Sequence, residues 1–389
     1  MAADLAVVSA RGAARWQRGH PWIFRSDVVR FPDAAAGAVC VEDPRGRAIG
    51  TALWSPHSEI SLRMVDHDPG ASLDHSWWMD RIGRAVRRRD DIVRHSSACR
   101  LAHGEGDALP SLVCDRYDRW LVVQLMSAGL EAFRPAVVEA LVALTGCEGI
   151  LARHDLALRD REGLPRETVL LHGDVPREVA VHEHGVTYLA APWTGQKTGA
   201  FLDQRENRHR IGALARGRAL DCFAYHGSFA LHLAERADTV LAIDASAAAL
   251  QRARENAARN GRTTIEFMEA DAFEALRTLE RAGDRFDTIV VDPPAFAKNR
   301  QSLAAALRGY HDINLRAVRL LAPGGLMLTA SCSFHLGKSR FLEMLERAAA
   351  DSGRLIALRE VCVQPADHPE VLTIPETGYL KGAILQAID

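Results

Sequence analysis

The sequence predicts an α/β protein in which a small β-rich segment and a central α+β segment precede a doubly wound parallel sheet. Its 389 residues exceed what one hydrophobic core usually serves, so two or three domains are expected. Short β-type runs separated by Gly and Pro turns occupy residues 5–66. Beyond Gly185, buried apolar runs alternate with helical stretches, which is typical of a parallel sheet covered by helices.

The N-terminal segment contains clear strand patterns at 38–42 and 59–65. Pro69 and Gly70 mark a turn, and a helical pattern then runs from Trp77 to about His95 with its arginines in outward positions. We therefore place the first domain at residues 1–70.

The central segment predicts strand, strand, helix, strand, strand, an order that suggests a compact α+β domain over residues 71–184. Its elements are expected at 111–115, 120–125, 134–144, 149–152 and 169–171.

The last domain, residues 185–389, is expected to hold the parallel sheet. Its strand candidates are 219–223, 240–243, 265–267, 289–291 and 326–329. In sheets of this kind the ligand lies at the carboxyl ends of the strands, so the residues that follow each strand are the candidate site.

Overall charge excludes a protein that coats nucleic acid by bulk electrostatics, because the net charge is only -2. Contact with RNA would have to be local, through arginine clusters, although each cluster alone is more typical of a solvated helix face. The two clusters are Arg81, Arg84, Arg87, Arg88, Arg89 and Arg94, and Arg205, Arg208, Arg210, Arg216 and Arg218.

The cysteines are seven in number, scattered, and without a Cys-x-x-Cys pair, so neither a disulfide framework nor a zinc site is expected, and no metal is predicted. The N-terminal residues lack a secretory signal pattern. The uncharged run at 320–337 is interrupted by Pro323 and two glycines, so no membrane span is expected. These features favour a cytoplasmic protein.

The first strand of the parallel sheet leads into a turn that contains Phe223, Tyr225 and Gly227. The Gly-x-Gly-x-x-Gly pattern that a pyrophosphate requires is absent, which argues against a nicotinamide dehydrogenase. One glycine suits a ligand with an aminoacyl tail better than a dinucleotide.

Acidic residues follow the second and third strands. Asp244 can accept both ribose hydroxyl hydrogens, and Ser246 is a plausible N-cap for the helix after it. Asp271 can bind the exocyclic amine of adenine, and Ala272 can donate its backbone N–H to the ring. Each carboxylate could instead be only a helix cap, but together with Gly227 they describe an adenosine pocket.

The fourth strand ends in Asp292-Pro293-Pro294-Ala295-Phe296. Two prolines fix an extended loop, which could hold a planar base against Phe296 while Asp292 contacts its polar edge. The alternative interpretation is a simple strand terminator.

The fifth strand delivers Cys332, between two serines, to the same edge of the sheet as Asp292. Cys40, Cys114, Cys147 and Cys222 are better interpreted as inert small hydrophobic residues. Cys332 is therefore the candidate nucleophile.

The residues just described give the chain a resemblance to the large-subunit (23S) ribosomal RNA cytosine-5 methyltransferases, which join a PUA domain to a Rossmann-like catalytic domain. The resemblance is carried by residues 195–208, 292–296 and 329–333, and further by 18–24, 104–110, 115–117, 366–369 and 379–382.

This resemblance implies that S-adenosylmethionine (SAM) is the cofactor and that Cys332 adds to carbon 6 of cytosine while Asp292 contacts the base. It implies Pro293, Pro294 and Phe296 as substrate contacts. Its 23S RNA partner would be naked or part of an assembly intermediate, and a homodimer is left open. The full expected cofactor set is Asp203, Arg205, Phe223, Tyr225, Gly227, Asp244, Ala245, Asp271, Ala272 and Asp292.

Two departures from the family pattern are visible. Gly227-Ser228 stands where relatives often have paired glycines, and Ala295 stands where a lysine is common. The nearest alternative function is methylation of a guanine or adenine nitrogen by the Asp292 loop without a thiol. A non-catalytic RNA-binding module and a small-molecule methyltransferase are further alternatives, disfavoured respectively by the intact acidic set with Cys332 and by the two accessory domains.

Overall fold

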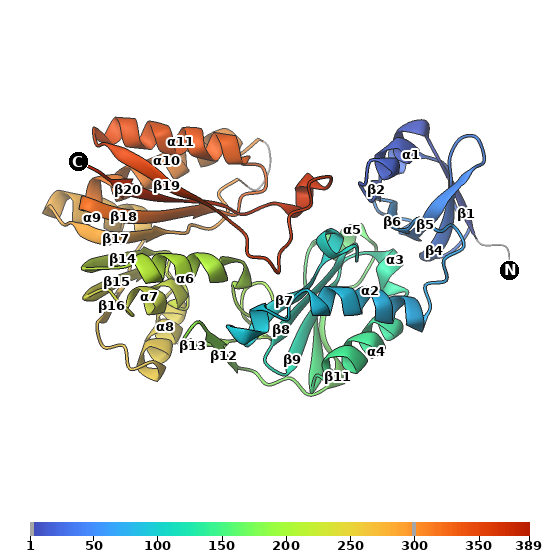
Figure 1. Ribbon diagram of the computed structural model, residues 1–389, viewed down its shortest axis with the longest axis horizontal. Coiled ribbons are helices and arrows are strands. Elements are labelled where there is room, and N and C mark those ends of the chain that lie inside the picture. Colours follow the sequence, from blue (N-terminus) through green and yellow to red (C-terminus); the bar gives the residue numbers. More distant parts are fainter. Residues whose placement is uncertain (1–3, 298–300) are drawn as a thin grey trace. The chain divides into compact units, whose positions relative to one another are not determined.

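The computed structural model describes residues 4–297 and 301–389, which form two compact units (Figure 1). Unit 1 comprises the residues up to Val181 together with Ala190–Leu202 and Ala366–Gly378. Unit 2 comprises His182–Leu189, Asp203–Pro365 and Tyr379–Asp389. Neither unit is one continuous stretch of sequence. Among the described residues, no helix has the length and apolar character needed to span a membrane.

Unit 1 begins with a six-stranded sheet in the order β2-β6-β5-β4-β1-β3. Strands β1 and β4 are parallel, and the other neighbouring pairs are antiparallel. Ser9 caps the first helix by accepting a hydrogen bond from the Gly12 N–H at 3.1 Å. The elements are β1 (Leu5–Val8), α1 (Ala10–Gln17), β2 (Trp22–Ile23), η1 (Arg25–Asp27), β3 (Val28–Arg30), β4 (Gly37–Glu42), β5 (Ala48–Trp54) and β6 (Leu62–Asp66).

The second sheet of unit 1 has the order β11-β10-β9-β8-β7, with only β9 and β10 parallel. Apolar residues of α2 and α4 pack against its buried strands, as the apolar periodicity predicts. The elements are α2 (His75–Arg87), η2 (Ile92–Arg94), β7 (Ala98–His103), η3 (Gly104–Asp107), β8 (Leu112–Tyr117), β9 (Trp120–Leu125), α3 (Ala128–Glu131), α4 (Arg134–Thr145), β10 (Gly149–His154), α5 (Leu158–Arg161) and β11 (Glu167–Gly173).

Arg89 corrects the prediction that the arginines of this region point outward. The helix ends at Arg87 and not near His95, and Arg89 is only 1% exposed. Its guanidinium binds both carboxylate oxygens of Asp107, at 2.7 and 2.6 Å, and donates to the backbone oxygen of Asp367 at 2.8 Å. The arginine is buried because a buried carboxylate supplies its counter-charge.

Unit 2 is built on a seven-stranded sheet in the order β16-β15-β14-β17-β18-β20-β19. Before it come the paired strands β12 (Val179–Glu183) and β13 (Val186–Ala190). The other elements are η4 (Leu202–Gln204), α6 (Arg205–Leu214), β14 (Arg218–Cys222), α7 (Ser228–Leu233), β15 (Thr239–Asp244), α8 (Ala247–Arg259), β16 (Ile265–Glu269), α9 (Ala272–Ala282), β17 (Phe286–Val291), α10 (Leu303–Leu320), β18 (Leu321–Ser331), α11 (Lys338–Ser352), β19 (Ile356–Val363), η5 (Pro375–Thr377, in unit 1) and β20 (Lys381–Ala387).

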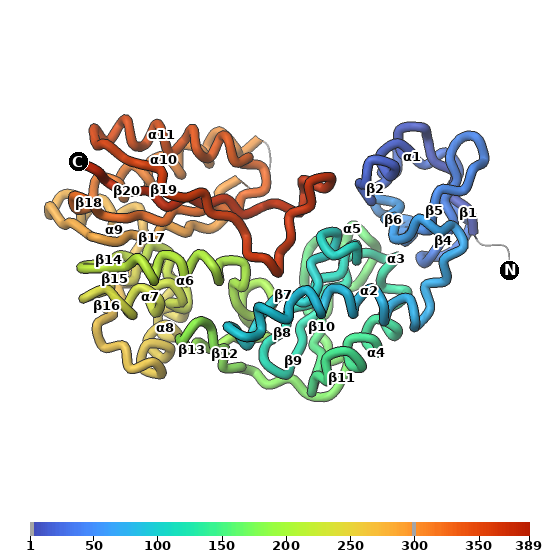
Figure 2. The backbone as a smooth tube through the Cα atoms, in the orientation of Figure 1, coloured from blue at the N-terminus to red at the C-terminus, as the bar shows by residue number. Residues whose placement is uncertain are grey.

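Strand directions in unit 2 agree with the predicted parallel sheet for β14 to β18. The prediction is wrong at the other edge, because β20 runs antiparallel between β18 and β19. The sheet is therefore mixed. Between β19 and β20 the chain makes a long excursion, followed in Figure 2, and Ala366–Gly378 of that excursion belong to unit 1.

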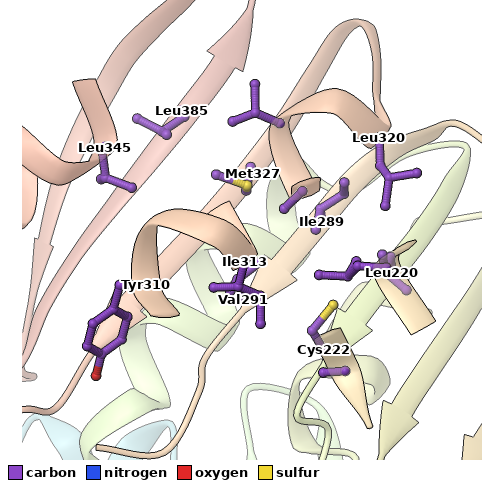
Figure 3. Packing of buried hydrophobic residues seen from close by; sticks show 14 of the residues in the cluster. Leu220, Cys222, Ile289, Val291, Tyr310, Ile313, Leu320, Met327, Leu345 and Leu385 are labelled. Carbon is purple, nitrogen blue, oxygen red and sulfur yellow. The ribbon is translucent and has the colours of Figure 1, made fainter. Parts of the chain in front are cut away.

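Helices cover both faces of this sheet, with α9, α10 and α11 on one face and α6, α7 and α8 on the other (Figure 1). Figure 3 shows Ile313 of α10 beside Val291 of β17; Tyr310 of α10, Met327 of β18 and Leu345 of α11 belong to the same buried core. All five side chains are at least 95% buried. This core fixes the strands whose carboxyl ends carry the predicted site.

The second arginine cluster is also partly buried. Arg208 of α6 is 2% exposed and binds the two oxygens of Glu183 at 2.7 Å each. His232 and Tyr188 contact the same carboxylate. Burial alone would raise the pKa of Glu183, but the charges and hydrogen bonds of Arg208 and His232 together outweigh burial, and the pKa lies well below its usual value. Arg208 is thus a structural ion-pair partner and not a solvated helix residue.

Candidate functional site

The carboxyl ends of the parallel strands lie in register in unit 2. Cys222 at the end of β14 pairs with Ile243 of β15 and with Val291 of β17, and Val291 pairs with Thr329 of β18. The loops that follow these strands therefore begin side by side along one edge. Most of the predicted site residues lie in these loops.

The loop between β14 and α7 has an unusual backbone. Phe223, Tyr225 and Gly227 have φ values of 64°, 49° and 78°. The left-handed region costs an aromatic residue roughly 1–3 kcal/mol, so the surrounding structure must hold this loop in place. At Gly227 an added Cβ would approach the Cβ of Ala253 to 3.0 Å. The glycine is therefore required where the loop meets α8.

Asp244 organises that loop from the end of β15. Its Oδ2 accepts a hydrogen bond from the Tyr225 N–H and its Oδ1 accepts one from the Ser246 N–H, each at 2.8 Å. Because each carboxylate oxygen has a further lone pair, Asp244 can still accept two hydroxyl hydrogens. Ala245, beside it, is exposed. Ser246 caps α8 as predicted, accepting from the Ala249 N–H at 3.2 Å.

Asp271 is the N-cap of α9. Its Oδ1 accepts hydrogen bonds from the N–H groups of Phe273 and Glu274, at 3.0 and 3.1 Å. Its side chain is exposed, whereas Ala272, the first residue of the helix, is buried. Asp271 is therefore a helix cap, which was the alternative interpretation of this residue from the sequence. An exposed carboxylate beside a helix N-terminus can in addition receive an amine donor.

Asp221 is a residue of this edge that sequence reasoning did not select. It is fully buried in β14, and its Oδ2 accepts from the Ala230 N–H at 3.0 Å. Its Oδ1 has no hydrogen-bond partner within the described parts of the chain. Burial, together with Asp292 and Asp244, raises the pKa of Asp221 far above its usual range. The sequence signal was an acidic residue inside an otherwise apolar strand.

Asp292 follows β17, and its Oδ1 accepts from the Gln204 side-chain amide at 2.9 Å. Pro293 is buried and Pro294 is exposed, so the loop emerges from the sheet between them. The half-buried ring of Phe296 packs 4.6 Å from that of Tyr310, measured between centroids. Phe296 is therefore partly committed to the core, which leaves only part of its ring for a base.

Cys332 follows β18 and is half-buried. The serines on either side of it are buried, and the Tyr310 hydroxyl bonds to Ser331 Oγ at 2.9 Å and to Ser333 Oγ at 2.8 Å. Ser333 Oγ also accepts from the Ala297 N–H at 3.2 Å. This network joins the cysteine turn to the loop that begins at Asp292, so the two predicted catalytic residues belong to one connected structure.

Cys222 also lies at this edge but differs in environment. It is fully buried in the core, and burial beside Asp221 raises the pKa of its thiol strongly. A thiol in such surroundings stays protonated. Of the two cysteines at the carboxyl edge, Cys332 alone is partly accessible.

Asp203 and Arg205 are 2% and 1% exposed. Asp203 Oδ2 accepts from the Tyr379 hydroxyl at 2.9 Å, and Arg205 forms an ion pair with Glu206 at 3.0 Å. Asp203 lies in η4 and Arg205 is the first residue of α6, so neither is at a strand end. A further residue, Phe334, lies two positions after Cys332 and is 55% exposed. An exposed aromatic ring there is suited to stacking on a base.

The sheet order and its acidic carboxyl edge are those of an α/β enzyme that binds a nucleoside-containing ligand. Residues 99–381 match the family model described as S-adenosylmethionine-dependent methyltransferase, and residues 7–67 match a PUA-like domain. Because the first match covers well over half of the chain, this protein belongs to the S-adenosylmethionine-dependent methyltransferase family. Its cofactor is accordingly SAM.

Several known proteins are similar to it. The chain is 38% identical over 379 residues to the ribosomal RNA large subunit methyltransferase I of Aeromonas salmonicida, covering 95% of this chain and 96% of that protein. It is 39% identical over 381 residues to the protein of the same name from Tolumonas auensis, covering 95% and 96%.

Among solved structures, a candidate SAM-dependent methyltransferase from Streptococcus mutans has a TM-score of 0.83 at 18% identity, covering 99% of this chain and 100% of that one. A methyltransferase complexed with S-adenosylhomocysteine, SAH, has a TM-score of 0.84 at 18% identity, with the same coverage. These structures show that the fold is shared.

Proposed function

We propose that this protein methylates carbon 5 of a cytosine in 23S ribosomal RNA, with Cys332 as the nucleophile. The carrying observation is that Cys332, half-buried, lies on a turn joined through Tyr310 and Ser333 to the loop that begins at Asp292. A thiol is needed for methylation at carbon 5 and not for methylation at a nitrogen. The names of the relatives support a large-subunit RNA as the substrate.

The cofactor would occupy the carboxyl edge of β14, β15 and β16. Asp244 would accept the ribose hydroxyls, Asp271 the adenine amine, and Ala272 would donate to the ring. The strained loop of Phe223, Tyr225 and Gly227 would border the methionine tail, with Asp203, Arg205, Ala245 and Asp292 completing the expected set. A buried carboxyl oxygen of Asp221, in the strand that leads into this loop, has no hydrogen-bond partner among the described residues, which supports a polar ligand at this edge.

The residues of this chain would divide the reaction among them. SAM supplies an electrophilic methyl group. The thiolate of Cys332 adds to carbon 6 of cytosine, forming an S–C bond and making carbon 5 nucleophilic enough to accept that methyl group. Asp292 would hold the polar edge of the base, with Pro293, Pro294 and Phe296 around it. Loss of the carbon 5 proton to a general base then breaks the S–C bond, and Cys332 leaves as a thiolate.

The remaining parts of the chain would hold the RNA, because a base must leave its stack to reach such a site. We propose the division into a PUA domain over residues 1–70, a central domain over 71–184 and a catalytic domain over 185–389. The PUA-like match at residues 7–67 supports the first of these. RNA contact would be local and would weaken with salt.

The test is to map modified nucleotides in 23S RNA from cells with and without the gene, by nucleoside mass spectrometry and sequencing. We expect the loss of one 5-methylcytosine. Loss of a methylated guanine or adenine instead would favour the nitrogen-methylating alternative, and an unchanged 23S RNA would contradict both.

Asp244→Ala is expected to weaken SAM binding by about 1.5 to 3 kcal/mol, or roughly 10- to 150-fold in Kd, because it removes a charged acceptor. Isothermal titration calorimetry measures this. The matched control is Asp238→Ala, which removes an exposed carboxylate just before the amino end of the same strand. Equal affinity of the two folded variants would remove Asp244 from the cofactor site.

A further inference from the structure

Lys381 lies next to the turn that carries Cys332, although the two residues are 49 positions apart in the sequence. It is the first residue of β20, and its register partner in β18 is Ser331, the residue before Cys332. Its Nζ donates hydrogen bonds to the backbone oxygens of Ser333 at 2.6 Å and Tyr379 at 2.7 Å. The side-chain amine of Lys381 therefore contacts Ser333, the residue after Cys332. The backbone of Lys381 pairs with Ser331, the residue before Cys332.

The side chain of Lys381 is only 6% exposed, which is rare for a lysine without a paired charge. Its two hydrogen-bond acceptors are neutral carbonyls. In the described part of the chain, no carboxylate lies within ion-pair distance of its Nζ. Among the described residues, the charge of Cys332 favours the ammonium form of Lys381. A thiolate at Cys332 would therefore supply a counter-charge for this buried amine.

Other titratable groups around the Cys332 thiol disfavour its negatively charged form. Tyr310 of α10 feels the charge of Cys332, and burial followed by that charge raises the pKa of its phenol. Asp292, at the end of the neighbouring β17, is a carboxylate and would also disfavour a second negative charge. Burial, opposed in part by the charge of Cys332, lowers the pKa of Lys381 to about 8. The amine and the thiol thus favour each other's charged forms.

We propose that Lys381 is a positioning residue whose ammonium group stabilises the thiolate of Cys332. This inference rests on the proposed function for its role in methyl transfer, although the ion pair itself does not depend on the identity of the RNA. The Cys332 thiol releases its proton to solvent, the ammonium of Lys381 keeps its own, and the thiolate is then available to form the S–C bond. Lys381 need not touch the substrate.

The experiment is the pH dependence of iodoacetamide alkylation at Cys332, read by peptide mass spectrometry on the full chain. Lys381→Met, which keeps the length but removes the charge, should raise the alkylation midpoint of Cys332 by about one pH unit or more. Lys381→Arg should restore most of the shift. The half-buried Cys40 of unit 1 serves as an internal control in each digest and should not change.

An unchanged midpoint in folded Lys381→Met would overturn the proposal, as would an arginine variant that behaves like the methionine variant. Should Lys381→Met not fold, the wild-type protein decides, because its Cys332 midpoint must lie below the ordinary cysteine value of about 8.5. The proposed function fails separately: Cys332→Ala that still forms 5-methylcytosine would contradict it without altering the alkylation result.

Discussion

Cys332→Ala is expected to reduce methyl transfer to 23S RNA by at least about 10³-fold while SAM affinity stays within about twofold of wild type. The reason is chemical: carbon 5 of cytosine attacks the methyl group only after a nucleophile has added at carbon 6. Methyl transfer from radiolabelled SAM and calorimetry measure the two quantities. With RNA that carries 5-fluorocytosine at the target, the wild-type protein should form a covalent adduct that survives a denaturing gel, because fluorine blocks the final elimination.

Cys362→Ala is the matched control, because it removes a buried thiol from β19 of the same sheet. It should keep both activity and adduct formation. A Cys332→Ala protein that methylates at a near wild-type rate would transfer the assignment to Asp292 and Phe296, and with it the reaction to a ring or exocyclic nitrogen.

Arg89→Met should lower the free energy of unfolding of unit 1 by about 3–5 kcal/mol, since it leaves the carboxylate of Asp107 buried without its two-point partner. Burial alone would raise the pKa of Asp107, and the hydrogen bonds and charge of Arg89 bring it below its usual value. Arg88 is half exposed and can compensate only in part. Urea unfolding followed by tryptophan fluorescence measures the loss.

Arg87→Met is the control, because it changes an exposed arginine at the end of α2, two residues before Arg89. We expect it to alter stability by no more than about 0.5 kcal/mol. Adding Asp107→Asn to Arg89→Met should recover part of the loss, since the uncompensated charge is then gone. A loss below about 1 kcal/mol in the single variant would mean that the ion pair contributes little to the fold.

Local sequence signals predicted the local features of unit 2. Ser246 caps α8 as predicted, and Gly261 follows the helix with a φ of 63°. These features depend on residues a few positions apart, which is the range over which capping rules apply. The carboxyl ends of β14, β15 and β17 fall within one residue of their predicted positions.

Features that depend on distant partners escaped the sequence analysis. Nothing near Arg89 or Arg208 distinguishes them from solvated arginines, because their carboxylates come from other elements. The reversed direction of β20 is set by where the chain re-enters the sheet and not by its composition. Lys381 was visible only as part of a motif, since its relation to Cys332 arises from strand pairing.

In the candidate site, too, local sequence signals predicted some residues and missed others. Asp244 and Asp271 were found because they lie at the end of a strand or just after one, whereas Asp221 lies within a strand and was passed over as part of an apolar run. Its importance becomes visible only through burial and an unsatisfied oxygen. An acidic residue inside a buried strand is a signal that could have been used.

The excursion between β19 and β20 has a consequence for biosynthesis. The backbone oxygen of Asp367 accepts a hydrogen bond from Arg89, 278 residues earlier, and the Asp367 carboxylate accepts one from the Arg100 N–H at 2.9 Å. Most of unit 1 is therefore synthesised long before the residues that complete the buried ionic network of this unit are translated. Unit 1 should therefore remain sensitive to proteases until Ala366–Gly378 have left the ribosome, and should become resistant only after that segment has packed into it.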